Sequence, residues 1–275
     1  MRTKTRLTIT LSESILDAVD SSINGITVRN RSHAIETFIK KSLSPSIKTA
    51  VILAGGNKER DQNPCLTKIG KGYLLTHILD NLKNNHINRV IVCLHKTDTE
   101  VMRIFGKGEN YGINIEYLVE EQPLGTGGAV KKAKDLVKNS PFLVIHGDTL
   151  TNIDLSNLFS FHFTEKSLAT IAVKPRLGEP KYGQVFIEGN KIIKFLETSE
   201  NSGISIINTG IYIFDPKIFE IFPQKEVFTL EKDVFPKLAK QKQLTASIFQ
   251  GMWFDITDKD SLKKARDKWQ EIQTN

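Results

Sequence analysis

Four short apolar runs that alternate with helical patterns limit the folds open to this chain more than any other feature of its sequence. The apolar runs lie at 50–54, 89–94, 114–118 and 142–146, and the helical patterns lie near 73–84, 98–105 and 127–137. Strands and helices that alternate in this way form βαβ units, so the pattern predicts an α/β domain with a mainly parallel sheet. Ligands of such a sheet collect at the carboxyl ends of its strands.

Three of these runs end in residues that suit phosphate chemistry. A glycine pair after the first run exposes backbone amides with no Cβ in the way, so a nucleotide can lie directly against the chain. A glycine-rich stretch after the third run stands at a predicted helix start, where free N–H groups and the helix dipole favour acceptor groups. The predicted nucleotide-binding residues are Leu53, Ala54, Gly55, Gly56, Gln122, Gly125, Thr126, Gly127 and Gly128.

A metal site is predicted from two carboxylates. Asp148 follows the fourth run after a glycine, and Asp255 lies in the short apolar segment 251–256, from which it could converge on the same ion. Mg²⁺ suits such a pair, because it is commonly held by one or two carboxylates together with substrate phosphates. Near this pair, His146 is interpreted as a packed strand residue rather than a base, and Glu231 either as compensation of a helix dipole or as a sugar contact.

Composition excludes several classes of protein. With 275 residues, 39% hydrophobic and 25% charged, the chain is long enough for a sizeable core. It contains no apolar run near the ~18–20 residues of a membrane span and no secretory signal pattern, so we expect a cytoplasmic protein without a membrane partner. Cys65 and Cys93 have no zinc or disulfide spacing and are expected to be free thiols.

The first 48 residues differ in charge from the rest of the chain. They carry eight Lys or Arg against four acids, whereas the remaining residues carry 30 against 27. This imbalance indicates a polyanionic partner for the front segment. The sequence Ser44-Pro45-Ser46 indicates a linker, so two domains are predicted at 1–46 and 49–275.

The front segment reads as one strand and two helices. Residues 6–11 alternate apolar and polar side chains, and helical patterns follow Ser12 and Asn30. One strand and two short helices cannot close a core alone, so we expect dimerisation through the strand. Over residues 3–43 the segment resembles the ribbon-helix-helix family of DNA-binding proteins. That resemblance implies contacts to duplex DNA from Arg6, Thr8, Thr10, Arg31 and Ser32. The alternative is a dimerisation arm that does not bind DNA.

From residue 49 to 269 the chain resembles the sugar-1-phosphate nucleotidyltransferase family, and most closely its mannose- and heptose-1-phosphate guanylyltransferase branch. The motifs that carry the resemblance are Leu53-Ala54-Gly55-Gly56, 121–129, Gly147-Asp148-Thr149, Lys181-Tyr182-Gly183, Phe195-Leu196-Glu197, 208–212, 230–233 and 253–256. The resemblance implies a Rossmann-like glycosyltransferase-A fold, and transfer of a nucleotidyl group from an NTP to a sugar 1-phosphate with release of pyrophosphate. It also implies Asp148 and Asp255 as Mg²⁺ ligands, and a sugar pocket formed by Gly183, Glu197, Asn208 and Gly210.

The signature loop departs from the family pattern. The segment 57–65 is several residues shorter than expected, Pro64 stands where a lysine is expected, and Thr198 replaces a second lysine. Arg60 keeps the expected arginine position, and Lys58, Lys68, Lys71 or Lys194 could substitute for the lysines. The predicted catalytic set is therefore Arg60, Lys58, Lys68, Asp148 and Asp255.

Losing one positive charge that is held in place at an active site lowers the rate by ~10²–10³-fold. Because two expected lysines are missing here, two further hypotheses about function stay open. One is a transcriptional regulator whose degenerate transferase domain only senses a nucleotide or nucleotide sugar, and the other is a catalytically silent assembly protein. The expected partners are an NTP, a sugar 1-phosphate, duplex DNA and a second copy of the chain in a homodimer or higher even oligomer.

Overall fold

The computed structural model describes residues 7–25, 27–43, 46–56, 62–177, 182–197 and 203–273. The chain divides into two compact units, Met1–Pro45 and Ser46–Asn275, which are described separately. The predicted roles of Arg6, Lys58 and Arg60 concern positions outside the described residues.

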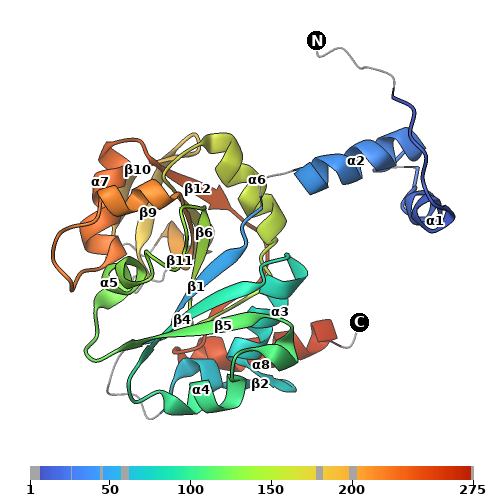
Figure 1. Cartoon of the computed structure of the whole chain (residues 1–275). Coiled ribbons are helices and arrows are strands. Elements are labelled where there is room, and N and C mark those ends of the chain that lie inside the picture. The colour runs from blue at the N-terminus through green and yellow to red at the C-terminus, as the bar shows by residue number, and fades with distance from the viewer. Residues whose placement is uncertain are drawn as a thin grey trace. The chain divides into compact units, whose positions relative to one another are not determined.

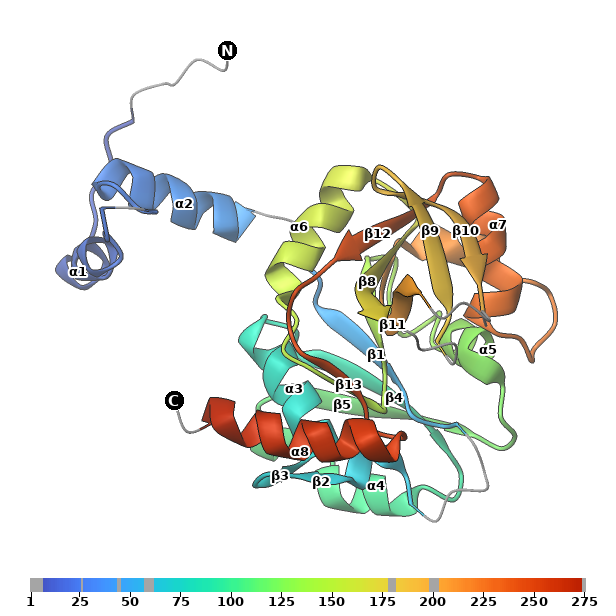
Figure 2. The same cartoon turned by 180° about the vertical axis from the view of Figure 1, so that it is seen from behind.

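A nine-stranded sheet forms the centre of the larger unit, in the order β5-β4-β1-β6-β11-β8-β12-β10-β9 (Figures 1 and 2). Its first four strands are parallel and coincide with the four predicted runs. They are β5 (Asn114–Glu120), β4 (Arg89–His95), β1 (Thr49–Leu53) and β6 (Phe142–His146). The sequence therefore identified the parallel half of the sheet.

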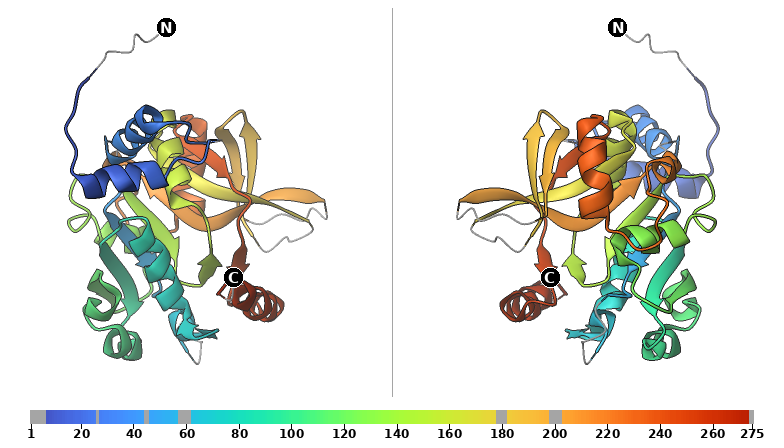
Figure 3. Two further views of the ribbon diagram at one scale, coloured as in Figure 1. Left: turned by 90° about the vertical axis from the view of Figure 1, so that its right-hand side faces the viewer. Right: turned by 90° about the vertical axis from the view of Figure 1, so that its left-hand side faces the viewer.

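The prediction of a mainly parallel sheet is wrong for the other half. Strand β11 pairs antiparallel with β6 and β8, and β10 pairs antiparallel with β9 and β12, while β12 is parallel to β8. Short connections such as the β9–β10 turn cannot make the crossover that parallel neighbours require. These strands are β8 (Ala169–Leu177), β9 (Gln184–Glu188), β10 (Lys191–Leu196), β11 (Ile204–Phe214) and β12 (Leu244–Ile248). Figure 3 shows the β9–β10 hairpin, in gold, at one end of the sheet.

Helices cover both faces of the sheet, because its central strands are apolar on both sides. Val51 and Ile52 of β1, for example, belong to two different buried clusters. The cluster around Ile52 includes side chains of α3 (Leu74–Asn84), α4 (Thr99–Phe105), α6 (Leu155–Glu165) and α8 (Lys259–Gln273). The cluster around Val51 includes side chains of α5 (Gly125–Lys132) and α7 (Phe235–Lys240). Within the described ranges no helix has the length and apolarity of a membrane span.

Short elements complete the larger unit. Strand β7 (Thr149–Thr151) pairs antiparallel with β13 (Trp253–Asp255), and β2 (Lys68–Ile69) pairs with β3 (Gly72–Tyr73). Single helical turns lie at Pro64–Leu66, Glu109–Tyr111 and Pro216–Glu220, and a π-helical turn lies at Leu230–Val234. The β7–β13 pair matters most for function, because it joins segments from the middle and the end of the domain.

The smaller unit contains two helices, α1 (Glu13–Ser21) and α2 (Arg31–Leu43). Val19 and Ala34 are buried, and the Arg31 guanidinium binds the Asp20 carboxylate at 2.6 Å. Residues 7–11 form no strand within this single chain, because a strand needs a hydrogen-bonded neighbour and none of the described residues supplies one. The predicted strand, which is expected to pair with a second copy of the chain, stays a prediction. Arg31, predicted to contact DNA, is paired with Asp20.

Candidate functional site

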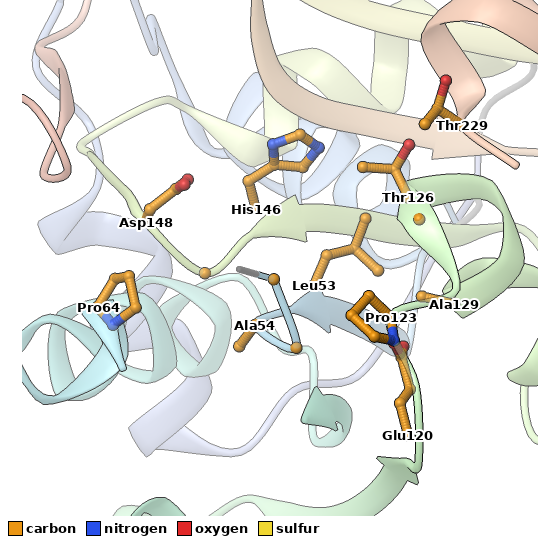
Figure 4. A pocket seen from close by; sticks show the side chains of 14 residues that line it. Leu53, Ala54, Pro64, Glu120, Pro123, Thr126, Ala129, His146, Asp148 and Thr229 are labelled. Atoms are coloured by element: carbon orange, nitrogen blue, oxygen red, sulfur yellow. The ribbon is translucent and has the colours of Figure 1, made fainter. Parts of the chain in front are cut away.

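The carboxyl ends of β1, β5 and β6 meet at a pocket of about 270 Å³ (Figure 4). Seven predicted site residues line it, namely Leu53, Ala54, Gly55, Gly56, Gly125, Thr126 and Asp148. The other lining residues are Pro64, Glu120, Pro123, Ala129, His146, Gly147 and Thr229. The pocket lies where ligands of parallel strands collect.

Glycines let the strand ends approach closely at this edge. A Cβ on Gly147 would lie 2.8 Å from Cβ of Ala54, and the Gly147 N–H donates to the Leu53 carbonyl at 2.8 Å. A Cβ on Gly55 would lie 3.3 Å from the backbone N of His95. No described residue lies within 4 Å of a Cβ placed on Gly56. Backbone rather than side chains therefore forms this wall of the pocket.

The turn after the signature loop is fixed to the same edge. The Asn63 Nδ2 donates to the Ala54 carbonyl at 2.8 Å, and its Oδ1 accepts from the Cys65 N–H at 3.0 Å. The buried Cys65 thiol lies 3.4 Å from the Gly147 carbonyl, to which it donates; its burial raises its pKa, so the sulfur stays protonated. Both Cys65 and Cys93 are free thiols, as expected. Gly56 and Pro64, one before and one after the segment 57–63, thus line the pocket.

The glycines of α5 have a different role from the predicted one. The N–H groups of Gly127 and Gly128 donate to the Phe228 carbonyl at 3.1 and 3.2 Å, and neither residue lines the pocket. A Cβ on Gly128 would lie 2.3 Å from the Glu226 carbonyl oxygen. The expectation that these two amides face a nucleotide is wrong for this structure, because the segment 226–228 packs over them.

The β7–β13 pair joins the segments that carry the two predicted metal ligands. Asp255 lies opposite Thr149, and the Ile256 N–H donates to the Asp148 carbonyl at 2.9 Å. Asp148 lines the pocket, and Asp255 accepts hydrogen bonds from the backbone and hydroxyl of Thr257 through one oxygen. Among the described residues no group of three or more His, Cys, Asp and Glu could hold a metal ion. A divalent cation can be held by one or two carboxylates with water and substrate as its remaining ligands, so Asp148 and Asp255 stay the predicted ligands.

The residues of the implied sugar pocket make contacts outside the lining of this pocket. At Gly210, with φ +75°, the register of β11 shifts, and a Cβ there would lie 2.8 Å from Cγ of His146. Asn208 donates to the Tyr212 hydroxyl at 2.9 Å, and its own N–H donates to the Gly183 carbonyl at 2.7 Å. Glu197 forms an ion pair with Lys232 at 3.0 Å. None of Gly183, Glu197, Asn208 and Gly210 lines the pocket itself.

The structure does not support Lys68 as a catalytic cation. Its ammonium lies over the Tyr73 ring at 5.9 Å from the centroid, and it does not line the pocket. Lys71 is exposed, and Lys194 lies over the Phe186 ring. No lysine or arginine is among the described residues that line the pocket.

Glu120 is a pocket residue that sequence reasoning missed. It ends β5, is only 3% exposed, and accepts a hydrogen bond from the Leu124 N–H at 3.2 Å. Burial raises the pKa of its carboxyl group. Its place at the end of a buried strand could have indicated it, but the apolar run at 114–118 ends two residues before Glu120.

A polar network forms the wall opposite Glu120. The Thr126 hydroxyl donates to Glu231 at 2.6 Å and accepts from the Leu230 N–H at 2.9 Å, and the Tyr212 hydroxyl also donates to Glu231, at 3.2 Å. His146 is a strand residue whose ring packs edge-on against Tyr212, and it also lines the pocket, which the sequence did not indicate. Glu231 accepts side-chain hydrogen bonds from two elements, which is more than dipole compensation requires.

The packing of α5 predicts an unusual effect of a glycine substitution. Replacing Gly128 by alanine should lower the free energy of unfolding by ~1–3 kcal/mol, because the new Cβ meets a backbone carbonyl that cannot rotate away. This overrides the gain in helix propensity of ~1 kcal/mol that alanine brings. Chemical denaturation measures the change, with Gly203→Ala as control because none of the residues described in the structure lies within 4 Å of a Cβ placed on Gly203. Equal stability of the two variants would contradict the packing described.

Comparison with known proteins identifies relatives of the larger unit. A family described as "Nucleotidyl transferase" matches residues 49–272. D-glycero-alpha-D-manno-heptose 1-phosphate guanylyltransferase of Aneurinibacillus thermoaerophilus is 32% identical over 227 residues, which cover 80% of this chain and 98% of that protein. Mannose-1-phosphate guanylyltransferase of Mycobacterium tuberculosis is 32% identical over 198 residues, and the match covers 69% of this chain and 55% of that longer protein.

Solved structures show the same fold. HddC from Yersinia pseudotuberculosis superimposes with a TM-score of 0.72 at 26% identity, covering 81% of this chain and all of HddC. HddC has also been solved in complex with GMP-PN, and that structure superimposes with a TM-score of 0.70. These matches confirm the predicted nucleotidyltransferase fold for the larger unit.

Proposed function

The chain belongs to the nucleotidyl transferase family, and on that premise we propose that it transfers a nucleotidyl group from an NTP to a sugar 1-phosphate, releasing pyrophosphate. The observation that carries the proposal is a pocket at the carboxyl ends of parallel strands, lined by four glycines and Asp148, whose segment pairs with the segment that carries Asp255. The names of the guanylyltransferase relatives support the same reaction class.

The charge of the pocket supports a metal-dependent reaction. The described lining carries two carboxyl groups, Glu120 and Asp148, and no lysine or arginine. A triphosphate and a sugar phosphate add further negative charge, so binding them together needs cations. We propose that Asp148 and Asp255 hold Mg²⁺, which when bound neutralises the phosphates, and that Lys58 and Arg60 carry the remaining charge. The chain's own task is then to place the sugar phosphate oxygen in line with the α-phosphorus.

Glu120 favours guanine as the base. Guanine presents two adjacent N–H donors, at N1 and N2, and an ionised carboxylate can only accept hydrogen bonds. The other bases do not offer two adjacent donors on one edge. The buried carboxylate stands beside Pro123 and across from Leu53 and Ala129, which provide apolar surfaces for a planar ring. Although burial raises the pKa of Glu120, two guanine donors would stabilise its charged form.

The first prediction concerns turnover and base choice. A coupled assay of pyrophosphate release, over four NTPs and a panel of sugar 1-phosphates, should show turnover with GTP. Glu120→Gln should reduce kcat/KM for GTP by ~10–100-fold, because an amide replaces one acceptor by a donor. Glu121→Gln is the matched control, since Glu121 is exposed and paired with Lys96. If the Glu120→Gln variant keeps the preference for GTP, the role of Glu120 is contradicted. If no combination of NTP and sugar 1-phosphate releases pyrophosphate, a domain that only senses a nucleotide is favoured.

The second prediction concerns the metal. Isothermal titration of GTP with and without Mg²⁺ should show Mg²⁺-dependent affinity that Asp148→Asn and Asp255→Asn each reduce by ~10-fold or more, because each removes one anionic ligand. Asp135→Asn, at an exposed position of the same domain, should behave as the parent protein. Metal-independent affinity in the parent protein would contradict the assignment. This binding test also applies to the alternative in which the domain senses a nucleotide without turnover.

For the smaller unit we propose a DNA-binding homodimer. Five apolar side chains are exposed in a segment whose described residues bury little, namely Leu7 at 77%, Ile9 at 45%, Ile15 at 52%, Phe38 at 43% and Ile39 at 45%. A second copy of the segment would cover them, with residues 7–11 of the two chains paired as antiparallel strands. Thr8 and Thr10 would then face away from the apolar side and toward the major groove, beside Arg6.

The third prediction separates dimerisation from DNA binding. Ile9→Asp should make the protein monomeric in multi-angle light scattering and abolish DNA binding, because it places a charge in the apolar contact. Thr10→Ala should leave the dimer intact but weaken binding to sites selected from a random duplex library by ~1–3 kcal/mol. If the full chain enriches no site, the segment is a dimerisation arm without DNA binding. If the parent chain is monomeric, both parts of the proposal fail.

A further inference from the structure

The net positive charge of the larger unit is concentrated on α8 and on the β2–β3 pair. Residues 49–275 carry 30 Lys or Arg against 27 acids. Helix α8 and residues 68–73 together hold seven of these basic residues and only the three acids Asp260, Asp267 and Glu271, so the rest of the unit is balanced, with 23 against 24. The seven basic side chains are all exposed, namely Lys68, Lys71, Lys259, Lys263, Lys264, Arg266 and Lys268.

Five of these residues lie along one line on the surface. Lys259, Lys263 and Arg266 recur at i, i+4 and i+7 of α8, so they share one face of the helix. The Arg266 guanidinium donates to the Lys68 carbonyl at 3.4 Å, so this face adjoins β2, as Figure 2 shows. Asp260 and Asp267 form a separate row on α8, and residues 68–73 contain no acid. We call the set Lys68, Lys71, Lys259, Lys263 and Arg266 the basic stripe.

The charges of the basic stripe are not neutralised within the part of the chain that the structure describes. No ion pair there joins any of its five side chains to a carboxylate. Helix α3 packs against α8 through His77 and Trp269, and its exposed Asp80 and Lys83 leave the balance unchanged. Like charges held near one another repel, and a polyanion bound along the stripe would relieve that repulsion.

The surface suits a linear phosphate polyanion rather than a membrane. A helix that lies on a membrane needs exposed apolar side chains beside its cations. The apolar side chains of α8 (Leu262, Ala265 and Trp269) instead pack in the buried cluster around Ile52. No large hydrophobic side chain among the described residues of α8 and 68–73 is exposed. The helix spaces its charges by ~6 Å per four residues, and lysines on flexible stems suit contacts to phosphates without base readout.

We propose that the basic stripe binds the phosphate backbone of duplex DNA, as a second contact of the chain that does not read sequence. The inference rests on the DNA binding proposed for the smaller unit. Because the two units belong to one chain, DNA bound by one unit is present at a high effective concentration for the other. Each phosphate that the stripe neutralises releases a counterion, so the stripe steepens the salt dependence of binding and leaves the choice of site unchanged.

The salt dependence of DNA binding by the full chain tests the stripe. Gel shifts are run over a salt series with the duplex selected from a random library and with an unrelated duplex. The triple variant Lys259→Gln, Lys263→Gln and Arg266→Gln should lower the slope of log K against log [salt] by ~2–3, which corresponds to three lost phosphate contacts. It should weaken binding to both duplexes by the same factor, ~10-fold or more at 0.1 M salt.

The matched control removes the same charge from the other face of the sheet. Lys237→Gln, Lys240→Gln and Lys242→Gln alter exposed lysines on and just after α7, whose buried side chains belong to the cluster around Val51. This variant should keep the slope of the parent protein. Thermal denaturation of both triple variants establishes that they are folded.

The outcomes separate the stripe from the proposed function of the smaller unit. If the parent protein binds its selected duplex and the stripe variant keeps the parent's slope, the stripe proposal is overturned and the DNA binding of the smaller unit stands. An equal loss of slope in the α7 variant would make the effect one of net charge, which also overturns the stripe. If the parent protein binds no duplex, both proposals fail. Vesicles that contain phosphatidylserine form a further arm, and binding to them that the stripe variant loses, with its DNA slope unchanged, would assign the stripe to a membrane instead.

Discussion

The close approach of β6 to β1 is the constraint on which the rest of the site depends. The Gly147 N–H donates to the Leu53 carbonyl at 2.8 Å, and any side chain at residue 147 would meet Ala54. Because the two strands are parallel, this contact puts the glycine pair after β1 and Asp148 after β6 at the same edge. The Cys65 thiol donates to the carbonyl of the same Gly147, so the position of the turn at Pro64–Leu66 also depends on the close approach of β6 to β1.

A second group of contacts brings the end of the chain to this edge. Strand β13 is held by its pairing with β7 and by donors from β8, where Lys174 donates to the Gly251 carbonyl at 2.6 Å and Arg176 to the Trp253 carbonyl at 3.0 Å. The Trp253 indole in turn donates to the Thr209 carbonyl of β11 at 2.8 Å. The segment of Asp255 is therefore positioned by three other strands, which explains how two segments about a hundred residues apart in sequence become neighbours.

The sequence predicted what depends on local pattern and missed what depends on packing between distant segments. Strand periodicity located β1, β4 and β6, and the position of Asp148 after a buried run placed it in the pocket. The glycines of α5 were assigned to a ligand, yet Gly127 and Gly128 make room for residues 226–228, a hundred residues later, which no local pattern reveals. The place of His146 in the pocket wall was missed for the same reason, since the gap at Gly210 and the partner Tyr212 both come from β11.

The central claim is that this edge is a nucleotidyl transfer site despite its shortened loop, and the reverse reaction tests it most directly. The protein is incubated with GDP-mannose or another GDP-sugar, Mg²⁺ and labelled pyrophosphate, and nucleotides are separated by ion exchange. The account predicts label in GTP that depends on both Mg²⁺ and the GDP-sugar, because transfer is reversible at the same α-phosphorus. Tight GDP-sugar binding with no label in GTP for any GDP-sugar would contradict it.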